Sequence, residues 1–466
     1  MKVYISQFIK PRRWPVTLEP MLFLFFLSYM ISMIVNSNMV YWKGCNLNVT
    51  EEPDIGIIKC EGEDKDKSLK EMALINIWKL IAQEIIGLSF IVFAGPWSDN
   101  HGCRRLPLLF LPVIGQITGD LLNIFSAVYW NEVTPAVTSI GFTLVTTITG
   151  SMSCFFIGMY SYLSDITDNT NRTMRLGFAS AVVPLAATIG PILSGILNVK
   201  IGFINVFLFN ILLNISGLCF GILLIYDSSD PNKVIKSTLK STFDPKIVKN
   251  IITIVLKERK NHKRTILHLM MIASAIIMAP FLGEMSVMPS YLRKTFNFTE
   301  ISFSQFYSYL MGVMLIGTTI SLGIFSRIFR MNDSLIGLIA TVFDLAAAVA
   351  FFLVRDAWLI MFVPLLQLFR GASLAIHGAI ASKCVEPYEI ASMNSFRLVI
   401  EGLFKALVLP MYNMIYYETL NTYPSAFFLL TVVLTIPCLF IFSITYYLTR
   451  TESEENSTEK NTTIKT

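Results

Sequence analysis

Charged residues are scarce in this sequence. Asp, Glu, Lys and Arg make up 15% of its 466 residues, whereas a soluble globular chain carries about 25%. This scarcity excludes a soluble enzyme, a disordered chain, a disulfide scaffold and a nucleic-acid binder. The four histidines and seven cysteines show no spacing typical of a metal site, and no glycine-rich phosphate loop is present. We therefore expect no metal, no cofactor and no ATP-driven pump.

Apolar residues dominate instead. They make up 54% of the chain, which holds 35 Phe and 21 Met, and the mean hydropathy is +0.60. A helix needs about 20 apolar residues to cross a bilayer, and runs of this length fit helices rather than the strands of a barrel. The sequence therefore predicts an all-α polytopic membrane protein with twelve spanning helices, near 20–42, 72–95, 106–128, 134–160, 175–198, 202–226, 266–291, 302–326, 332–354, 357–383, 389–417 and 422–448.

A basic linker divides the twelve spans into six and six. Residues 227–265 carry ten basic and four acidic residues. Apolar side chains between Ile247 and Leu256 recur at helical spacing, which favours an amphipathic helix on the membrane surface over a solvated linker. We expect a first half at 1–226, the linker at 227–265, a second half at 266–450 and a disordered tail at 451–466.

The distribution of basic residues predicts the orientation of the chain. Lys and Arg are more frequent in the loops on the side of both termini and of the linker than in the opposite loops. Because Lys-rich and Arg-rich loops stay cytosolic, both termini are expected in the cytosol. We expect a monomeric multi-pass protein of the plasma membrane rather than of a lysosomal or endosomal membrane.

The loops on the opposite side carry the expected covalent modifications. Residues 43–71 contain Cys45, Cys60 and a sequon at Asn48, and a second sequon begins at Asn297 after the seventh span. Of the seven cysteines, only Cys45 and Cys60 face an oxidising compartment, so a disulfide between them is expected. Asn48 and Asn297 are expected to carry glycans, because both lie on the side that is glycosylated.

The most informative motif lies between the second and third spans. It reads Gly95-Pro96-Trp97-Ser98-Asp99-Asn100-His101-Gly102-Cys103-Arg104-Arg105, and a weaker copy, Gly323-Ile324-Phe325-Ser326-Arg327-Ile328-Phe329-Arg330, follows the eighth span. Gly102 permits a tight turn, and Asp99 can pair with an arginine or cap the next helix. The repeated motif and the six-plus-six division resemble the major facilitator superfamily, in which two homologous halves surround a site at the midplane.

This resemblance implies a gate at the cytosolic ends of the helices. We expect the motif and its neighbours to hold the cytosolic end closed when the site faces outward. The gating residues are expected to be Gly95, Asp99, Gly102, Arg104, Arg105, Asp165 and Arg175.

Further short motifs resemble solute carrier family 46, the group of the proton-coupled folate transporter and the thymic stromal cotransporter homologue. They are Glu19-Pro20, Pro96-Trp97-Ser98, Tyr160-Ser161-Tyr162-Leu163-Ser164-Asp165-Ile166-Thr167, Asn171-Arg172-Thr173-Met174-Arg175 and Ser382-Lys383-Cys384-Val385. The resemblance implies proton-coupled uptake of small organic anions such as folates, antifolates or peptidoglycan fragments. Two departures speak against folate itself: the fifth span lacks the carboxylate of the folate carrier, and His377-Gly378 stands where that carrier has an arginine.

Nine ionisable residues fall within the predicted spans. A charge at the centre of a spanning helix costs about 2.5–3.5 kcal/mol, so these side chains must face one another or a wet cavity. The bases are Lys79, Arg370, Arg397 and Lys405, and the acids are Glu84, Asp120, Glu284, Asp344 and Glu401. For Asp120 and Asp344, on the third and ninth spans, we favour a structural hydrogen bond to a neighbouring helix.

Helical spacing predicts which polar side chains share a face. Such stripes run along the first, second, tenth and eleventh spans, which line the cavity in the superfamily; they are Ser28, Ser32 and Asn36; Asn76, Lys79 and Gln83; Gln367, Arg370 and His377; and Asn394, Arg397, Glu401 and Lys405. We therefore expect the substrate to contact Lys79, Gln83, Arg370, Arg397, Glu401 and Lys405.

The substrate carboxylate is expected to bind a base that no acid occupies. Arg397 and Glu401 are spaced to form an i, i+4 pair. Arg370 has no acid three or four residues away, so it is the first choice for the carboxylate, and Lys79 is the second. The alternative is that all four bases only neutralise structural acids.

A carboxylate on the seventh span is the first choice for the proton carrier. Glu284 lies on a helix that Pro280, Gly283 and Pro289 allow to bend. Glu84 is a further candidate, together with Glu401, and His377 also titrates in a useful range.

These features predict a secondary active transporter, not an enzyme. It is expected to move small organic anions with protons as the coupling ion, by alternating access between the two sides of the bilayer. The alternatives are a proton-independent facilitator or exchanger of organic anions, and a non-transporting membrane receptor. The expected partners are the anionic substrate and the lipid bilayer, with no nucleic acid.

Overall fold

The computed structural model describes residues 17–45, 60–100, 105–167, 172–225, 256–259, 262–329, 331–386 and 389–463. These residues form helices and turns, with no strand among them. Before the linker lie α2 (Glu19–Gly44), α3 (Gly62–Asn100), α4 (Leu106–Val128), α5 (Pro135–Ile148), α6 (Ser151–Ile166) and α7 (Arg172–Leu224). After it lie α10 (Lys263–Phe296), α11 (Glu300–Ile320), the π-helix η2 (Ser321–Ile328), α12 (Asp333–Leu353), the 3₁₀-helix η3 (Leu359–Met361), α13 (Val363–Leu366), α14 (Arg370–Lys383), α15 (Ile390–Thr419) and α16 (Phe427–Thr463).

Eleven helical segments in the described part are long and apolar enough to cross a membrane. One of them belongs to α7, whose 53 residues would extend about 80 Å as one straight helix. The chain reverses direction at Gly202, whose φ of 77° lies in the region that favours glycine. Arg175 pairs with Glu19 and Gly221 packs against Met21, so both ends of α7 lie beside the start of α2. Since α7 therefore contains two spans, the prediction of twelve is confirmed.

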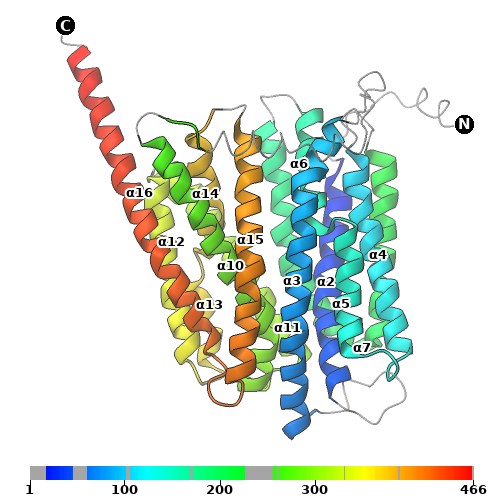
Figure 1. Cartoon of the computed structure of the whole chain (residues 1–466). Coiled ribbons are helices and arrows are strands. Elements are labelled where there is room, and N and C mark those ends of the chain that lie inside the picture. Colours follow the sequence, from blue (N-terminus) through cyan, green and yellow to red (C-terminus); the bar gives the residue numbers. More distant parts are fainter. Residues whose placement is uncertain are drawn as a thin grey trace, which may run out of the picture.

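The spans stand side by side as one helical bundle (Figure 1). We call the end that carries the Cys45–Cys60 bond the disulfide end. The opposite end, at which α2 and α10 begin, is called the linker end. The prediction that the linker end faces the cytosol remains a prediction.

Two spans at corresponding places of the two halves are interrupted. The fourth span breaks between α5 and α6, where Gly150 and Ser151 have φ of 98° and 47°. The tenth span breaks between α13 and α14, so that Arg370 opens α14. Interrupted spans in matching positions of two halves often mark a binding site in secondary transporters.

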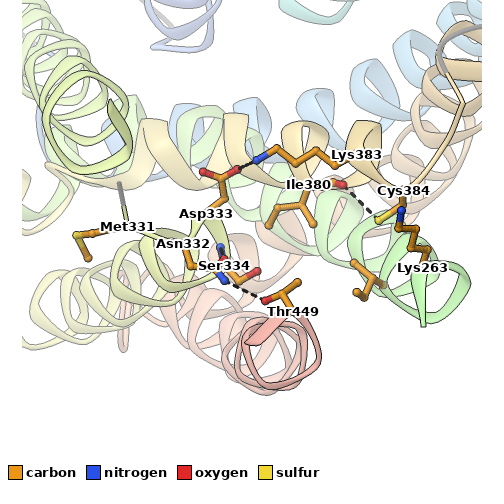
Figure 2. A pocket seen from close by; sticks show the side chains of 10 residues that line it. Lys263, Met331, Asn332, Asp333, Ser334, Ile380, Lys383, Cys384 and Thr449 are labelled. Atoms are coloured by element: carbon orange, nitrogen blue, oxygen red, sulfur yellow. Dashed lines mark hydrogen bonds and ion pairs between the residues drawn. The ribbon is translucent and has the colours of Figure 1, made fainter. Parts of the chain in front are cut away.

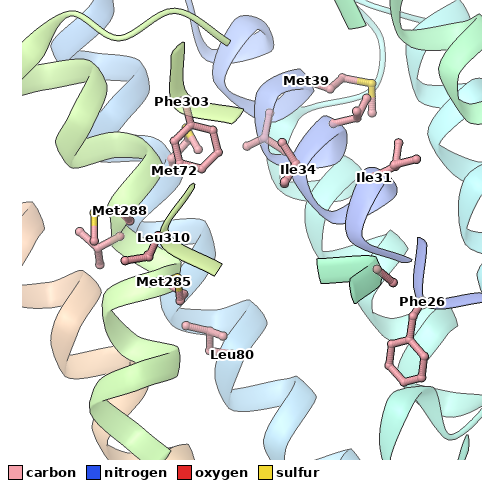
Figure 3. Close-up of a cluster of buried hydrophobic side chains, with 14 of the residues drawn as sticks. Phe26, Ile31, Ile34, Met39, Met72, Leu80, Met285, Met288, Phe303 and Leu310 are labelled. Atoms are coloured by element: carbon pink, nitrogen blue, oxygen red, sulfur yellow. The ribbon is translucent and has the colours of Figure 1, made fainter. Parts of the chain in front are cut away.

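Among the described residues, the apolar cores of the two halves merge toward the disulfide end. One continuous cluster joins Ile34 and Met72 of the first half to Met288 and Phe303 of the second (Figure 3). At the linker end, the second half has a separate cluster that includes Met270. The halves are therefore packed together at the disulfide end in this conformation.

Two sequence expectations meet a different local structure. The helix α3 continues to Asn100, so the motif from Gly95 to Asn100 is helical rather than a loop, and α4 begins at Leu106. The weaker copy of the motif, which begins at Gly323, lies mostly in the π-helix η2, and η2 continues the eighth span. The helix α16 is drawn to Thr463, whereas the sequence predicted a disordered tail from residue 451; that prediction stays untested. The predicted amphipathic helix, 247–256, lies outside the described residues except at Leu256.

Candidate functional site

A buried cluster of three charges lies inside the second half. The Arg370 Nη1 atom is 2.5 Å from Glu284 Oε2, and its Nε atom is 3.6 Å from Asp344 Oδ1. Arg370 and Glu284 are almost fully buried, with exposed fractions of 3% and 0%. One base therefore faces two acids, from α14, α10 and α12. If all three are ionised, the cluster carries one net negative charge.

Two hydroxyl groups complete the surroundings of Glu284. Thr431 on α16 donates to Glu284 Oε1 at 2.6 Å, and the Tyr412 hydroxyl on α15 lies 2.9 Å from that of Thr431. Gly283 leaves room for the ring of Tyr412, since a Cβ at that position would overlap it. Each Glu284 oxygen thus has a donor, which fixes the orientation of the carboxylate. Sequence analysis missed Thr431 and Tyr412, although Tyr412 shares the helical face of Lys405.

The expectation that Arg370 has no acidic partner is wrong. It rested on the neighbours of Arg370 within its own helix, whereas Glu284 and Asp344 reach it from α10 and α12. For Asp344, the sequence favoured a structural hydrogen bond to a neighbouring helix. The structure instead shows an ionic contact with Arg370. Arg370 is therefore occupied in this conformation, and its predicted contact with a substrate remains untested.

A second set of charges lies where α3 of the first half meets α15 of the second. Lys405 Nζ is 2.9 Å from Glu84 Oε2, so an ion pair links the two halves. Arg397 and Glu401 form the predicted i, i+4 pair, with 2.6 Å between Nη1 and Oε1. The two helices also pack closely at Gly402, because a Cβ at that position would overlap the side chain of Leu88.

Lys79 differs from the three other bases of the predicted set. Among the residues that the structure describes, no acid or hydrogen-bond acceptor contacts its ammonium group, while Arg370, Arg397 and Lys405 each have an acidic partner. Lys79 is half-buried on α3, one turn from Asn76, which reaches the Ser286 carbonyl oxygen of the second half at 3.5 Å. Its free charge therefore lies beside the contact between the halves. Gln83 lies one turn further along α3 and is also half-buried.

His377 is a buried polar residue without a partner. Its exposed fraction is 1%, and neither ring nitrogen has a hydrogen-bond partner in the described part of the chain. The Oε1 atom of Gln367, on the same span, likewise has no partner among these residues. The structure does not test whether His377 takes up a proton.

The polar stripe of the first span does not face the second half. Ser32 donates to Asp120 of α4 at 2.6 Å, and Asn210 and Asn214 of α7 donate to Ser32 and Ser28. The prediction that this stripe lines the cavity is therefore wrong: these side chains satisfy buried amides within the first half. For Asp120, the expected hydrogen bond to a neighbouring helix is confirmed.

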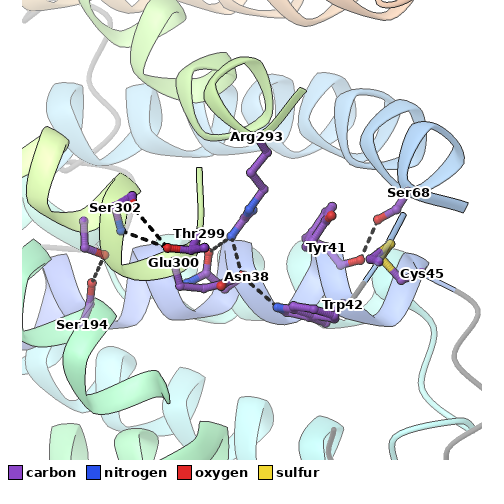
Figure 4. Close-up of polar contacts among 12 residues, drawn as sticks. Asn38, Tyr41, Trp42, Cys45, Ser68, Ser194, Arg293, Thr299, Glu300 and Ser302 are labelled. Atoms are coloured by element: carbon purple, nitrogen blue, oxygen red, sulfur yellow. Dashed lines mark hydrogen bonds and ion pairs between the residues drawn. A yellow bond between two sulfur atoms is a disulfide. The ribbon is translucent and has the colours of Figure 1, made fainter. Parts of the chain in front are cut away.

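Polar contacts across the two halves gather at the disulfide end (Figure 4). Arg293 of α10 donates to Asn38 of α2 at 2.5 Å and contacts Glu300 at 3.2 Å, and the Trp42 indole donates to Glu300 at 2.9 Å. Lys294 pairs with Asp66 of α3. Sequence analysis missed this cluster because its residues fall in or beside the loops, where charges are common.

The linker end shows ion pairs within the first half. Arg105 binds Asp165 of α6 at 2.9 Å and donates to the Ser98 hydroxyl. Arg175 binds Glu19 at 3.2 Å. Gly102 and Arg104 lie outside the described residues, and so does the side chain of Asp99. Gly95 lies in α3. The proposed gating role of these residues remains a prediction.

The start of α15 contacts two basic residues near the end of the linker. Lys257 and Arg259 contact the two carboxylate oxygens of Glu389 at 2.9 and 2.8 Å. Glu389 precedes the span that begins at Met393. Burial favours its neutral form, but hydrogen bonds from Lys257, Arg259 and the Glu386 amide outweigh burial and lower the pKa of Glu389 to about 2.

Of the predicted modifications, the disulfide between Cys45 and Cys60 is present. The exposed side chain of Asn297 accepts a hydrogen bond from Lys65 through Oδ1, so its amide nitrogen remains accessible to a glycan. Asn48 lies outside the described residues. Glycosylation of both remains a prediction. In the described part of the chain, no group of His, Cys, Asp or Glu could hold a metal ion.

The sequence profile of the Major Facilitator Superfamily matches residues 21–366, which is more than half of the chain. The chain therefore belongs to this superfamily.

Solved transporter structures share its fold. The human organic anion transporter MFSD10 (TETRAN) is 13% identical, with a TM-score of 0.62 over 91% of this chain and 97% of that one. The peptide transporter POT, a variant in complex with alafosfalin, is 12% identical, with a TM-score of 0.65 over 93% and 95%. A bacterial homologue of the human lysosomal transporter Spinster is 12% identical, with a TM-score of 0.57 over 91% and 97%. These similarities show the fold alone.

Proposed function

We propose that this chain is a secondary active transporter of small organic anions, driven by protons. The observation that carries the proposal is the division of the buried charges into two complementary sets. The C-half cluster, Glu284, Arg370 and Asp344, has one base and two acids. The interface set has three bases, Lys79, Arg397 and Lys405, against two acids, Glu84 and Glu401.

Each set lacks one charge of a particular sign. With all groups ionised, the C-half cluster has a net charge of 1 − 2 = −1 and the interface set has a net charge of 3 − 2 = +1. Uncompensated charge is unfavourable in a low-dielectric interior. A proton on the C-half cluster and one anionic group beside the interface set would make both neutral. The same state therefore favours a bound proton and a bound anion.

In this proposal, Lys79 holds the anionic group of the substrate. It has the free charge that a carboxylate needs, without the loss of an existing ion pair. Gln83 on the same face of α3 can donate to the substrate, and the pair between Glu84 and Lys405 adjusts as the halves separate. Arg370, the first choice from sequence, instead holds Glu284 in place.

Glu284 is the proposed proton carrier. A proton on it weakens its attraction to Arg370, and the charge of Arg370 then remains shared with Asp344. Since Glu284 is on α10 and Arg370 opens α14 after a break in its span, this loss of attraction frees two helices to move. Protonation would thereby bias the equilibrium between the two access states.

The proposal is tested with purified protein in proteoliposomes. Uptake of radiolabelled folate, methotrexate and muramyl dipeptide is measured with external buffer at about pH 5.5 or about pH 7.5 and an interior at about pH 7.5. We expect at least one anion to enter faster at the acidic pH, and Lys79→Met to abolish this uptake. The matched control is Lys200→Met, which changes an exposed lysine at the disulfide end. Absence of uptake for every compound would refute the organic-anion proposal, and pH-independent uptake would favour a facilitator.

Membership of solute carrier family 46 is also part of the proposal. The short motifs that resemble solute carrier family 46 support substrates of the folate, antifolate or peptidoglycan-fragment type. The plasma membrane, with both termini in the cytosol, is the proposed location, and the monomer is the proposed functional unit.

A further inference from the structure

A pocket of about 530 Å³ lies at the linker end of the second half, away from both buried charge sets. It is formed where α10, α12, α14 and α16 meet (Figure 2). The side chains that line it are Lys263, Ile266, Met331, Asn332, Asp333, Ser334, Ile380, Lys383, Cys384 and Thr449.

The lining of this pocket carries a net positive charge. Lys383 binds Asp333 at 2.5 Å, whereas the ammonium group of Lys263 has no partner among the described residues. Two bases against one acid leave a net charge of +1. The pocket also lies at the N-terminus of α12, a helix of 21 residues, whose dipole favours an anion.

A buried hydroxyl group in the pocket also lacks a partner. Ser334 has an exposed fraction of 1%, and its Oγ atom has no hydrogen-bond partner among the described residues. Its backbone amide donates to Asn332 Oδ1, and Asn332 Nδ2 donates to Thr449 across the pocket at 3.1 Å. A buried hydroxyl group without a partner is destabilising. Together with the free ammonium group of Lys263, it indicates a ligand with hydrogen-bond acceptors.

The pocket lies at the level where spanning helices begin and end. Lys263 and Asp333 open their spans, Lys383 closes the tenth, and Thr449 is the penultimate residue of the last. This is the depth of lipid headgroups, and basic pockets between spans bind anionic headgroups.

We propose that this pocket binds the headgroup of an anionic phospholipid. Its phosphate group would contact Lys263 and the Ser334 hydroxyl. A lipid is favoured over a soluble anion because the pocket lies between spanning helices at the depth of lipid headgroups. Since α10 carries Glu284 and α14 carries Arg370, a bound headgroup would also connect the ends of the two helices that hold the C-half cluster.

Native mass spectrometry of the purified protein tests this proposal. The probes are short-chain phosphatidylserine, phosphatidylcholine with the same chains, and inorganic phosphate. We expect the wild type to retain phosphatidylserine, with at least about tenfold weaker binding of the other two probes. Equal binding of phosphatidylcholine would overturn the preference for an anionic lipid. Equal binding of inorganic phosphate would identify a site for soluble anions instead.

Two variants test whether the lipid binds in this pocket. Lys263→Gln and Ser334→Ala should each weaken binding of phosphatidylserine several-fold, and their combination should abolish it. Lys263→Arg should retain binding, and Lys200→Gln, at the opposite end, is the matched control. Thermal unfolding without lipid checks that each variant is folded. Unchanged phosphatidylserine binding in the folded double variant would overturn the proposal.

Discussion

The two halves each bury a carboxylate at a corresponding place, on the third and the ninth span, but surround it differently. Asp120 of α4 accepts hydrogen bonds from Ser32 and Gln116, and no base contacts it among the described residues. Asp344 of α12 lies beside Arg370, which binds Glu284. The first half thus stabilises its acid with neutral donors, whereas the second contains a cluster whose net charge one proton can cancel. This difference supports the proposal that the proton binds in the second half.

Loss of a charged partner should distinguish the halves most strongly. Glu284→Ala should lower the free energy of unfolding by about 3–5 kcal/mol, because it leaves Arg370 buried with only the more distant Asp344. Asp120→Asn should cost about 1 kcal/mol, because its partners are a hydroxyl and an amide that can bind a neutral group. Thermal unfolding of both variants in one detergent measures the difference. Equal losses would contradict the comparison.

The ion pair between the halves should have the next largest effect. Glu84→Gln and Lys405→Gln should each lower the transport rate about tenfold, equivalent to about 1.4 kcal/mol, because each leaves one charge at the interface without its partner. Exchanging the two residues, with Glu84→Lys and Lys405→Glu, should restore part of the rate. Initial uptake rates, corrected for the amount of reconstituted protein, provide the measurement. A double exchange no better than the single variants would exclude a direct pair.

The disulfide end and the linker end differ in their contacts across the halves. Glu300→Gln weakens the contacts with Arg293 and Trp42, so it should shift the conformational equilibrium about three- to tenfold toward opening at the disulfide end. Asp165→Asn removes the partner of Arg105 within the first half and should leave that end closed. Distances between spin labels at the disulfide end test this. If Asp165→Asn opened the disulfide end more than Glu300→Gln does, the contacts of Glu300 would not be the ones that hold this end closed.

The contact between Glu389 and the linker residues Lys257 and Arg259 should have the smallest effect, about 1 kcal/mol, because Lys257 is 49% exposed and solvent screens its charge. The pKa of Glu389 is lowered to about 2 in the folded protein, so its stabilising contribution is complete above its ordinary pKa and is lost as pH falls toward the lowered one. The stability difference between the wild type and Glu389→Gln should therefore be constant from about pH 5 to about pH 8 and shrink below about pH 4. Unfolding midpoints across this pH range measure it. A change near neutral pH would contradict the account.

The sequence predicted the spans well because each needs only a long apolar run. It also predicted the pair of Arg397 and Glu401, which are one turn apart on the same helix. It did not predict that Glu284 and Asp344 reach Arg370, or that Ser32 turns toward Asp120, because these contacts depend on how helices are rotated against one another. Helical spacing shows which side chains share a face, but not which neighbour that face meets.

Proton movement during anion uptake tests the central claim most directly. Proteoliposomes with a pH-sensitive dye inside receive an anion that the uptake assay has identified, without an imposed pH gradient. The account predicts that the interior of wild-type vesicles acidifies as the anion enters. With Glu284→Gln, exchange of preloaded anion should continue without acidification, and with Lys79→Met neither signal should appear. Entry of the anion into wild-type vesicles without acidification would contradict coupled transport by the two charge sets.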